Sequence, residues 1–94
     1  MENKYDLSIF VNTLTEQDVL SGIVARVKER RKELRLTQRQ LAQRSGVSYA
    51  SLRRFESTGE ISFRSLLQIA SVLNALPDFC ELFSKEIVTD LKDY

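Results

Sequence analysis

The stretch LTQRQLAQRSGVSYASLRRF, residues 36–55, decides the fold of this chain. Each half begins with a hydroxyl side chain that can cap a helix N-terminus, at Thr37 and at Ser48. Gly46 lies between the halves, where the backbone needs a residue that tolerates a positive φ. The stretch therefore predicts two short helices joined by a tight turn, which together span about residues 38–57.

The apolar residues of this stretch have the sizes that a helix-turn-helix needs. Ala42 is small enough for two helices to approach closely, and Leu52 places an apolar side chain on the second helix, facing the first. Three further side chains complete the expected core, namely Leu41, Val47 and Phe55. Each of these residue types is common, but the full set with two caps is specific for a helix-turn-helix.

The flanking residues have helical periodicity and predict an all-α domain of five helices. The first helix has two possible starts. Thr15 can cap it, with Asp18 three residues later as the second half of a capping box. Because Gly22 weakens a helix locally, the alternative start lies nearer Ser21. The helix must end at residues 34–36, since the cap of the next helix follows at once.

Two more helices follow the motif. Ser62 caps the fourth, Asn74 closes it, and Pro77 suits the first turn of a fifth. The inward side chains of the fourth helix are predicted to be Leu66, Leu67, Ile69, Ala70 and Leu73. A stripe with a spacing of four residues predicts that the fifth helix continues toward the C-terminus, through Phe79, Phe83, Ile87 and Leu91.

Ninety-four residues allow one small domain. We expect that domain at residues 15–83, after an N-terminal extension at 1–14 and before an acidic tail or helix extension at 84–94. Part of the extension alternates as a strand would, at Tyr5, Leu7, Ile9 and Val11. The lone Cys80 is expected to be a buried small hydrophobe.

Charge is distributed unevenly, although the formal net charge is only +1. Between Ser21 and Gly59, ten Lys or Arg residues and three acids give a net charge of +7. The remaining residues contain four bases and ten acids, a net charge of −6. A basic middle between acidic ends is typical of a polyanion-binding face, and a solvated helix surface is the alternative interpretation.

Missing residue types exclude several classes of protein. The chain has no His and one Cys, which excludes imidazole catalysis, His-containing zinc sites, an internal disulfide and a cysteine-ligated cluster. No base or metal-ligand set is available to activate a nucleophile, so we expect no enzyme activity, no metal and no cofactor. The start lacks the apolar core of a signal peptide, and no apolar run approaches the ~20 residues of a membrane span. We therefore expect a cytoplasmic protein with no membrane contact.

The motif resembles the lambda-repressor-like (Xre/Cro) helix-turn-helix family. The segments LTQRQLAQ at 36–43 and GVS at 46–48 are highly typical of that family. The first helix matches that of lambdoid phage repressors at Arg26, Val27, Lys28 and Arg31. The resemblance covers about residues 23–73 and implies a five-helix DNA-binding domain whose third helix enters the major groove.

Two details go beyond this common pattern. The ending LPDFCELF, residues 76–83, is similar to antitoxin-type repressors of the HipB kind. Arg35 departs from the family, because many relatives have Gly or Asn at this junction. A positive φ at Arg35 costs ~1 kcal/mol, so we expect the backbone at this junction to differ from that of relatives with Gly or Asn there.

The resemblance also implies roles for individual residues. Base readout falls to Tyr49, Ala50, Arg53 and Arg54. Arg54 can bond bidentately to guanine and Ala50 can pack on a thymine methyl. Which of Arg53 and Arg54 reads a base stays open, and Tyr49 could contact a base or the backbone.

A second group is expected on the sugar–phosphate backbone. Its members are Gln38, Arg39, Ser48, Ser51, Ser57, Thr58 and Arg26. The N-terminus of the helix that begins at Gln38 adds free N–H groups that favour an anion. Arg31 and Glu56 correspond to a family pair that bridges the first and third helices, and we expect them to be structural.

The leading interpretation is a sequence-specific transcriptional repressor that binds double-stranded DNA as a homodimer. A domain this small cannot bury all of its apolar residues in this region, namely Phe63, Leu67, Phe79, Leu82 and Phe83. Relatives dimerise through the apolar surface left beyond the fourth helix. The alternative is a protein-interaction module of the same fold, such as the antitoxin half of a complex with a toxin-like partner.

Overall fold

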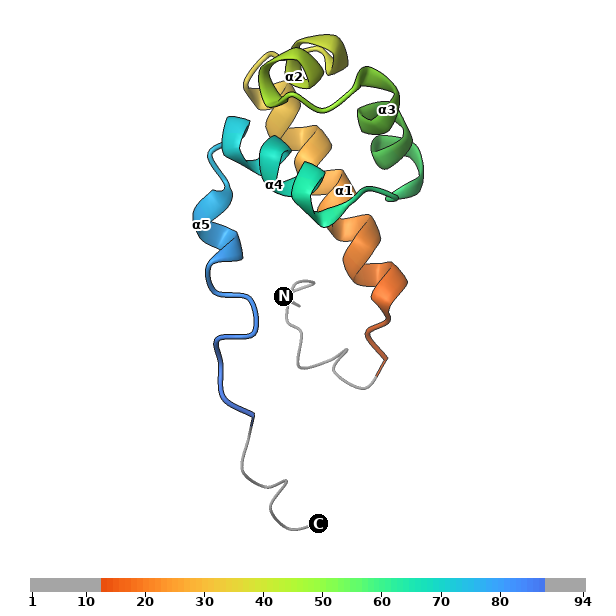
Figure 1. The fold of residues 1–94 in the computed structure, drawn as a ribbon. Coiled ribbons are helices and arrows are strands. Elements are labelled where there is room, and N and C mark those ends of the chain that lie inside the picture. Colours follow the sequence, from red (N-terminus) through yellow and green to blue (C-terminus); the bar gives the residue numbers. More distant parts are fainter. Residues whose placement is uncertain (1–12, 88–94) are drawn as a thin grey trace, which may run out of the picture.

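The two helices predicted from residues 36–55 are present in the computed structural model, which describes residues 13–87. They are α2 (Gln38–Ser45) and α3 (Tyr49–Thr58). The other helices of the described part are α1 (Glu16–Glu33), α4 (Phe63–Val72) and α5 (Leu76–Phe79), and no strand occurs there (Figure 1). The prediction of an all-α domain with five helices is confirmed.

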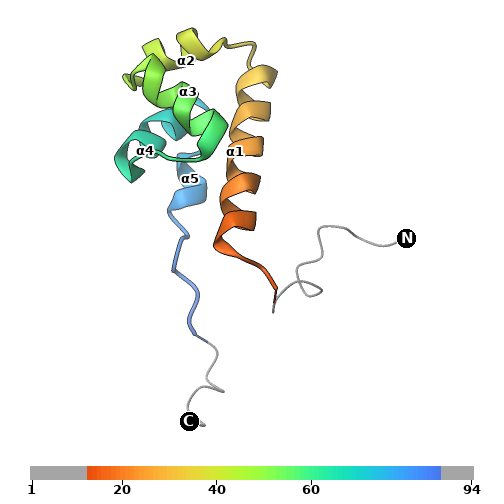
Figure 2. The same ribbon diagram turned by 90° about the vertical axis from the view of Figure 1, so that its right-hand side faces the viewer.

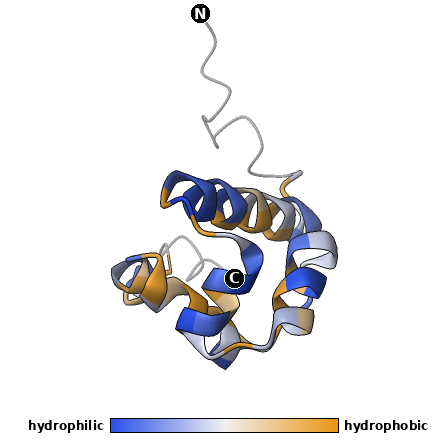
Figure 3. Cartoon of the chain, turned by 90° about the horizontal axis from the view of Figure 1, so that it is seen from above, coloured by the Kyte–Doolittle hydropathy of each residue, from blue (hydrophilic) through white to orange (hydrophobic). Residues whose placement is uncertain are grey.

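The long helix α1 lies along one side of the shorter helices (Figure 2). α3 packs against α1, and α2 packs against both α3 and α4. α5 packs against α4, and the chain after α5 runs away from the other helices in both ribbon views (Figures 1 and 2). Figure 3 shows hydrophilic and hydrophobic residues interspersed along the helices. This pattern is expected where the apolar side of a helix packs on its neighbours and the polar side faces solvent.

Hydroxyl caps fix where the helices begin. The Thr15 hydroxyl accepts a hydrogen bond from the backbone N–H of Asp18 at 3.0 Å, and the Asp18 carboxylate accepts one from the N–H of Thr15 at 3.1 Å. α1 therefore begins at Glu16, and the alternative start near Ser21 is wrong. The same reciprocal box joins Thr37 to Gln40, while Ser48 and Ser62 cap α3 and α4 with a single bond each.

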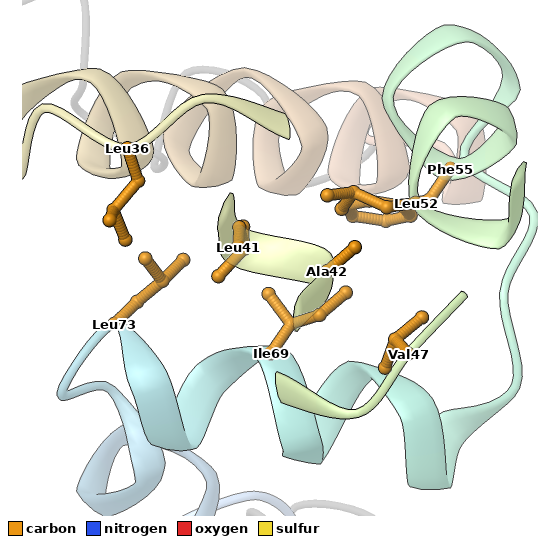
Figure 4. Close-up of a cluster of buried hydrophobic side chains, with 8 residues drawn as sticks. All are labelled: Leu36, Leu41, Ala42, Val47, Leu52, Phe55, Ile69 and Leu73. Carbon is orange, nitrogen blue, oxygen red and sulfur yellow. The ribbon is translucent and has the colours of Figure 1, made fainter. Parts of the chain in front are cut away.

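The core gathers side chains from the helix-turn-helix and α4. Leu41, Leu52 and Ile69 are fully buried, and Phe55 and Leu73 are nearly so. Figure 4 shows that these side chains point toward one another, together with Leu36, Ala42 and Val47. The predicted core of the motif is confirmed, whereas Leu66 and Leu67 of α4 are only half-buried.

Two glycines end helices in the left-handed conformation. Gly46 has φ 78° at the end of α2, and Gly59 has φ 85° at the end of α3. Arg35, at the junction between α1 and α2, also has a positive φ of 59°. The expectation that the backbone differs at this junction is therefore wrong, because Arg35 adopts the left-handed conformation that Gly or Asn would favour. Asn74 closes α4 with φ 60°.

Two predictions about the C-terminal part are wrong. α5 ends at Phe79, so Phe79, Phe83 and Ile87 do not form one helical stripe; a short helix needs packing to persist, and the chain leaves the domain here. For the same reason Cys80 is exposed. The strand-like alternation before residue 13 and the predicted helical residue Leu91 lie outside the described residues.

Glycine substitutions test the turn geometry. A Cβ on Gly59 would lie 2.8 Å from Cγ and Cδ2 of Leu20, so Gly59→Ala should destabilise the fold by about 2–5 kcal/mol through strain and overlap. On Gly46 a Cβ meets only the tip of Gln68 at 3.5 Å, and Gly46→Ala should cost about 1–2 kcal/mol through strain alone.

Gly22→Ala is the matched control in urea unfolding. Gly22 lies inside α1, where a Cβ would meet only the flexible end of Arg26, so this variant should gain about 0.5–1 kcal/mol. Equal unfolding free energies for the Gly59 and Gly46 variants would contradict the close approach of Leu20.

Candidate nucleic-acid interface

The ion pair predicted between the first and third helices is confirmed. Nε of Arg31 donates to Oε2 of Glu56 at 2.8 Å, and Nη2 donates to Oε1 at 3.0 Å. Only 10% of the Arg31 side chain and 3% of the Glu56 side chain are exposed. This bidentate pair therefore ties α1 to α3 inside the domain.

Two further hydrogen bonds extend the pair to α2. Nη1 of Arg31 donates to the carbonyl oxygen of Leu36 at 2.9 Å, in the connection before α2. Nε2 of Gln38, the first residue of α2, donates to Oε1 of Glu56 at 2.9 Å. One amide proton and the carbonyl oxygen of the Gln38 side chain are left for other partners.

A basic cleft opens beside this network. It is lined by residues of α1, α2 and α3 and has a volume of about 610 Å³. Its lining consists of Lys28, Arg31, Gln38, Ala50, Arg53, Arg54, Glu56 and Ser57. The cleft thus brings together Gln38, expected on the DNA backbone, with three of the four residues expected at bases.

Tyr49, the fourth expected base reader, contacts two arginines. The guanidinium carbon of Arg39 lies 4.0 Å from the ring centroid, and that of Arg53 lies 5.5 Å away. Both distances are within cation–π range. Because Arg39 is on α2 and Arg53 on α3, the half-buried ring links the two helices of the motif through their cations.

The serine and threonine hydroxyls near α3 are engaged within the chain. The hydroxyls of Ser57 and Thr58 donate to the carbonyl oxygen of Arg54 at 3.2 Å and 2.7 Å. The Ser48 hydroxyl donates to that of Ser51 at 2.9 Å. A hydroxyl has one proton, so in this arrangement Ser48, Ser57 and Thr58 have none left for a phosphate.

Lys28 lies at the basic cleft, and Arg26 does not. Arg26 lines a different surface, an apolar groove between α1 and the α4–α5 region, with Ile23, Val27, Arg30, Leu73, Ala75, Asp78, Phe79 and Leu82. The position of Lys28 could have been predicted from the sequence, because Lys28 precedes Arg31 by three residues and therefore lies on the same face of the helix. Once Arg31 is paired with Glu56 on α3, that face is the one turned toward α3.

Residues 13–87 contain neither a cluster of metal-ligating side chains nor a helix that could span a membrane. Within residues 13–87, His, Cys, Asp and Glu side chains do not gather in any group that could hold a metal ion. In the same part of the chain, no helix has the length and apolar character that crossing a membrane requires.

A family model described as "Helix-turn-helix" (HTH_3) matches residues 27–79, which is more than half of the chain. The chain belongs to this lambda-repressor-like, Xre-type family of DNA-binding transcription regulators. No curated protein and no solved structure matches the chain.

Breaking the buried pair should be costly. Arg31→Met removes the cation but retains an apolar stem, and leaves the Glu56 carboxylate buried without its charge partner. We expect a loss of about 3–5 kcal/mol in the free energy of unfolding, measured with urea. The control is Glu33→Gln, which breaks the exposed Arg30–Glu33 pair, 3.8 Å apart, and should change stability by less than about 0.5 kcal/mol. Similar losses for both variants would contradict the role of the buried pair.

Proposed function

We propose that this protein is a transcriptional repressor that places α3 in the major groove of double-stranded DNA. The observation that carries the proposal is the basic cleft, where side chains from three helices converge. Gln38 and Lys28 flank the exposed outer side chains of α3, and Ala50, Arg53 and Arg54 lie on that helix. A helix between phosphate-binding neighbours matches the shape of a major groove.

The chemistry of these side chains divides the work. Arg53 and Arg54 carry planar guanidinium groups that can bond to guanine O6 and N7, and the methyl of Ala50 suits the methyl of thymine. Gln38 begins α2, so its remaining amide proton and the free backbone N–H groups at that helix end favour a phosphate. Lys28 adds a positive charge at the same cleft, and Arg39 is held next to α3 by Tyr49.

The proposal includes a two-fold homodimer. One recognition helix reads only a few base pairs, so specificity requires two copies. Apolar side chains exposed near the C-terminal end of the described residues give a second copy something to bury: Leu76, Leu82, Phe83 and Ile87. Leu82 also lines the apolar groove between α1 and the α4–α5 region, which supports an interface near this end of the domain. The antitoxin interpretation would use the same surface for a toxin-like partner.

Substitutions at the cleft separate base readout from backbone contact. On a selected operator, Arg54→Ala should cost about 1–3 kcal/mol of binding free energy and relax one base preference. Gln38→Ala should weaken binding to all duplexes alike. Fluorescence anisotropy on the operator and its single-base variants measures both. Loss of sequence preference in the Gln38 variant alone would contradict the proposed orientation of α3.

Two cations of α1 provide the matched control for this measurement. Lys28→Ala should reduce the slope of log K against log salt by about 1, as loss of one phosphate contact does. Arg26→Ala removes the same charge from the same helix, but from the apolar groove, and should leave this slope unchanged.

The dimer is tested at Phe83, whose side chain is completely exposed in the single chain. Phe83→Asp should therefore leave the fold intact but convert a dimer into a monomer in sedimentation at micromolar concentration. Leu34→Ser, at an exposed apolar residue outside the groove, should leave the dimer intact. Footprinting should show inverted half-sites about 10–11 base pairs apart. If the wild type is a monomer and protects one half-site, the proposed dimer is wrong. If it co-purifies with a toxin-like protein, the antitoxin interpretation is favoured.

A further inference from the structure

An acidic side chain holds one of the arginines of α3. Glu60 follows the last residues of α3, and Oε1 of its carboxylate accepts a hydrogen bond from Nε of Arg54 at 3.0 Å. The same oxygen accepts a second hydrogen bond from Nη2 of Arg54. About two thirds of each side chain is exposed, so the pair is accessible on the surface of the domain.

The end of α3 determines where Glu60 lies. Gly59 closes the helix in the left-handed conformation, and its N–H donates to the carbonyl oxygen of Phe55 at 2.7 Å. The N–H of Glu60 then donates to the hydroxyl of Thr58 at 3.1 Å, and that hydroxyl donates to the carbonyl oxygen of Arg54 at 2.7 Å. The backbones of Arg54 and Glu60 are thus connected through one hydroxyl, which brings their side chains to the same place.

The pair leaves Arg54 able to recognise guanine. A guanidinium group has five N–H donors, and Glu60 takes the Nε proton and one Nη2 proton. Two protons on Nη1 and one on Nη2 are left, and one proton from each of these nitrogens forms the terminal edge of the group. That edge can still donate two parallel bonds to guanine O6 and N7.

Glu60 also lies on the side of Arg54 that is away from the basic cleft. Arg54 lines the cleft and a second hollow, whereas Glu60 lines only the second, together with Ser51, Ile61, Ser62 and Ser65. The carboxylate therefore binds the guanidinium on the side away from the basic cleft, whereas Arg53 and Gln38 lie on the side of the cleft.

From this geometry we infer that Glu60 is a specificity-determining residue, which positions Arg54 for one guanine and opposes binding to other sequences. The inference rests on the proposed DNA-binding function. Restricting Arg54 to one orientation favours the base pair that matches it, because less side-chain freedom is lost on binding. The negative charge at the surface lowers the sequence-independent attraction to phosphates, so the two effects both increase discrimination.

The test is a double-mutant cycle on the full chain. The affinity of wild type, Glu60→Ala, Arg54→Ala and the double variant is measured on the selected operator and on the operator with the guanine of Arg54 replaced. Glu60→Ala should bind random duplex more tightly and reduce the ratio of these two affinities about two- to fivefold, the size that an exposed ion pair supports. The change in the ratio should vanish when Arg54 is already Ala.

Glu29→Gln is the control for charge alone. Glu29 is an exposed acid of α1 that does not line the basic cleft, and its substitution should raise affinity for all duplexes by one factor without changing the ratio. If Glu60→Ala behaves like Glu29→Gln, or changes the ratio equally in the Arg54→Ala background, the inference is overturned while the proposed function stands. A wild type that binds no duplex at low salt would overturn the proposed function and this inference with it.

Discussion

The buried pair between Arg31 and Glu56 is the interaction on which the remaining arrangement depends. It occupies the point where α1, α2 and α3 meet, and each side-chain nitrogen of Arg31 and oxygen of Glu56 has a hydrogen-bond partner there. Within the described residues no buried side-chain nitrogen or oxygen is left without a hydrogen-bond partner. The attraction within a buried charge pair offsets the desolvation of its ions only where the geometry is good and further hydrogen bonds satisfy both partners. Here that geometry sets the start of α2 relative to the outer surface of α3.

Much of the fold could be predicted from the sequence because local signals and packing agree. Thr37 and Ser48 cap the helices they were expected to cap, and Gly46 has the positive φ that the turn needs. Ala42 and Leu52 are buried between the helices, as their sizes indicated. Each of these features depends on residues only a few positions apart in the sequence, so a short sequence pattern is enough to predict it.

The sequence was less informative where a side chain's neighbour is distant or absent. The apolar spacing after Phe79 looked helical, but periodicity does not show whether a partner surface exists, and α5 ends after one turn. Arg26 and Lys28 are both basic residues of α1, but Lys28 lies at the basic cleft and Arg26 at the apolar groove. The rotation of α1 about its own axis relative to α3 decides which residue faces which surface. The Tyr49 contacts and the hydrogen bonds that Arg54 donates to Glu60 depend on side-chain orientation, which no residue pattern encodes.

The joining of three helices through Arg31, Glu56 and Gln38 has a mechanical consequence. Side chains fixed to one rigid support keep their mutual spacing when a duplex meets them, so the duplex has to make the adjustment. The energy of bending or twisting DNA depends on its base steps, including steps that no side chain touches. If α3 enters the major groove as proposed, a support of this kind makes the stiffness of base pairs that no side chain touches part of what the protein distinguishes.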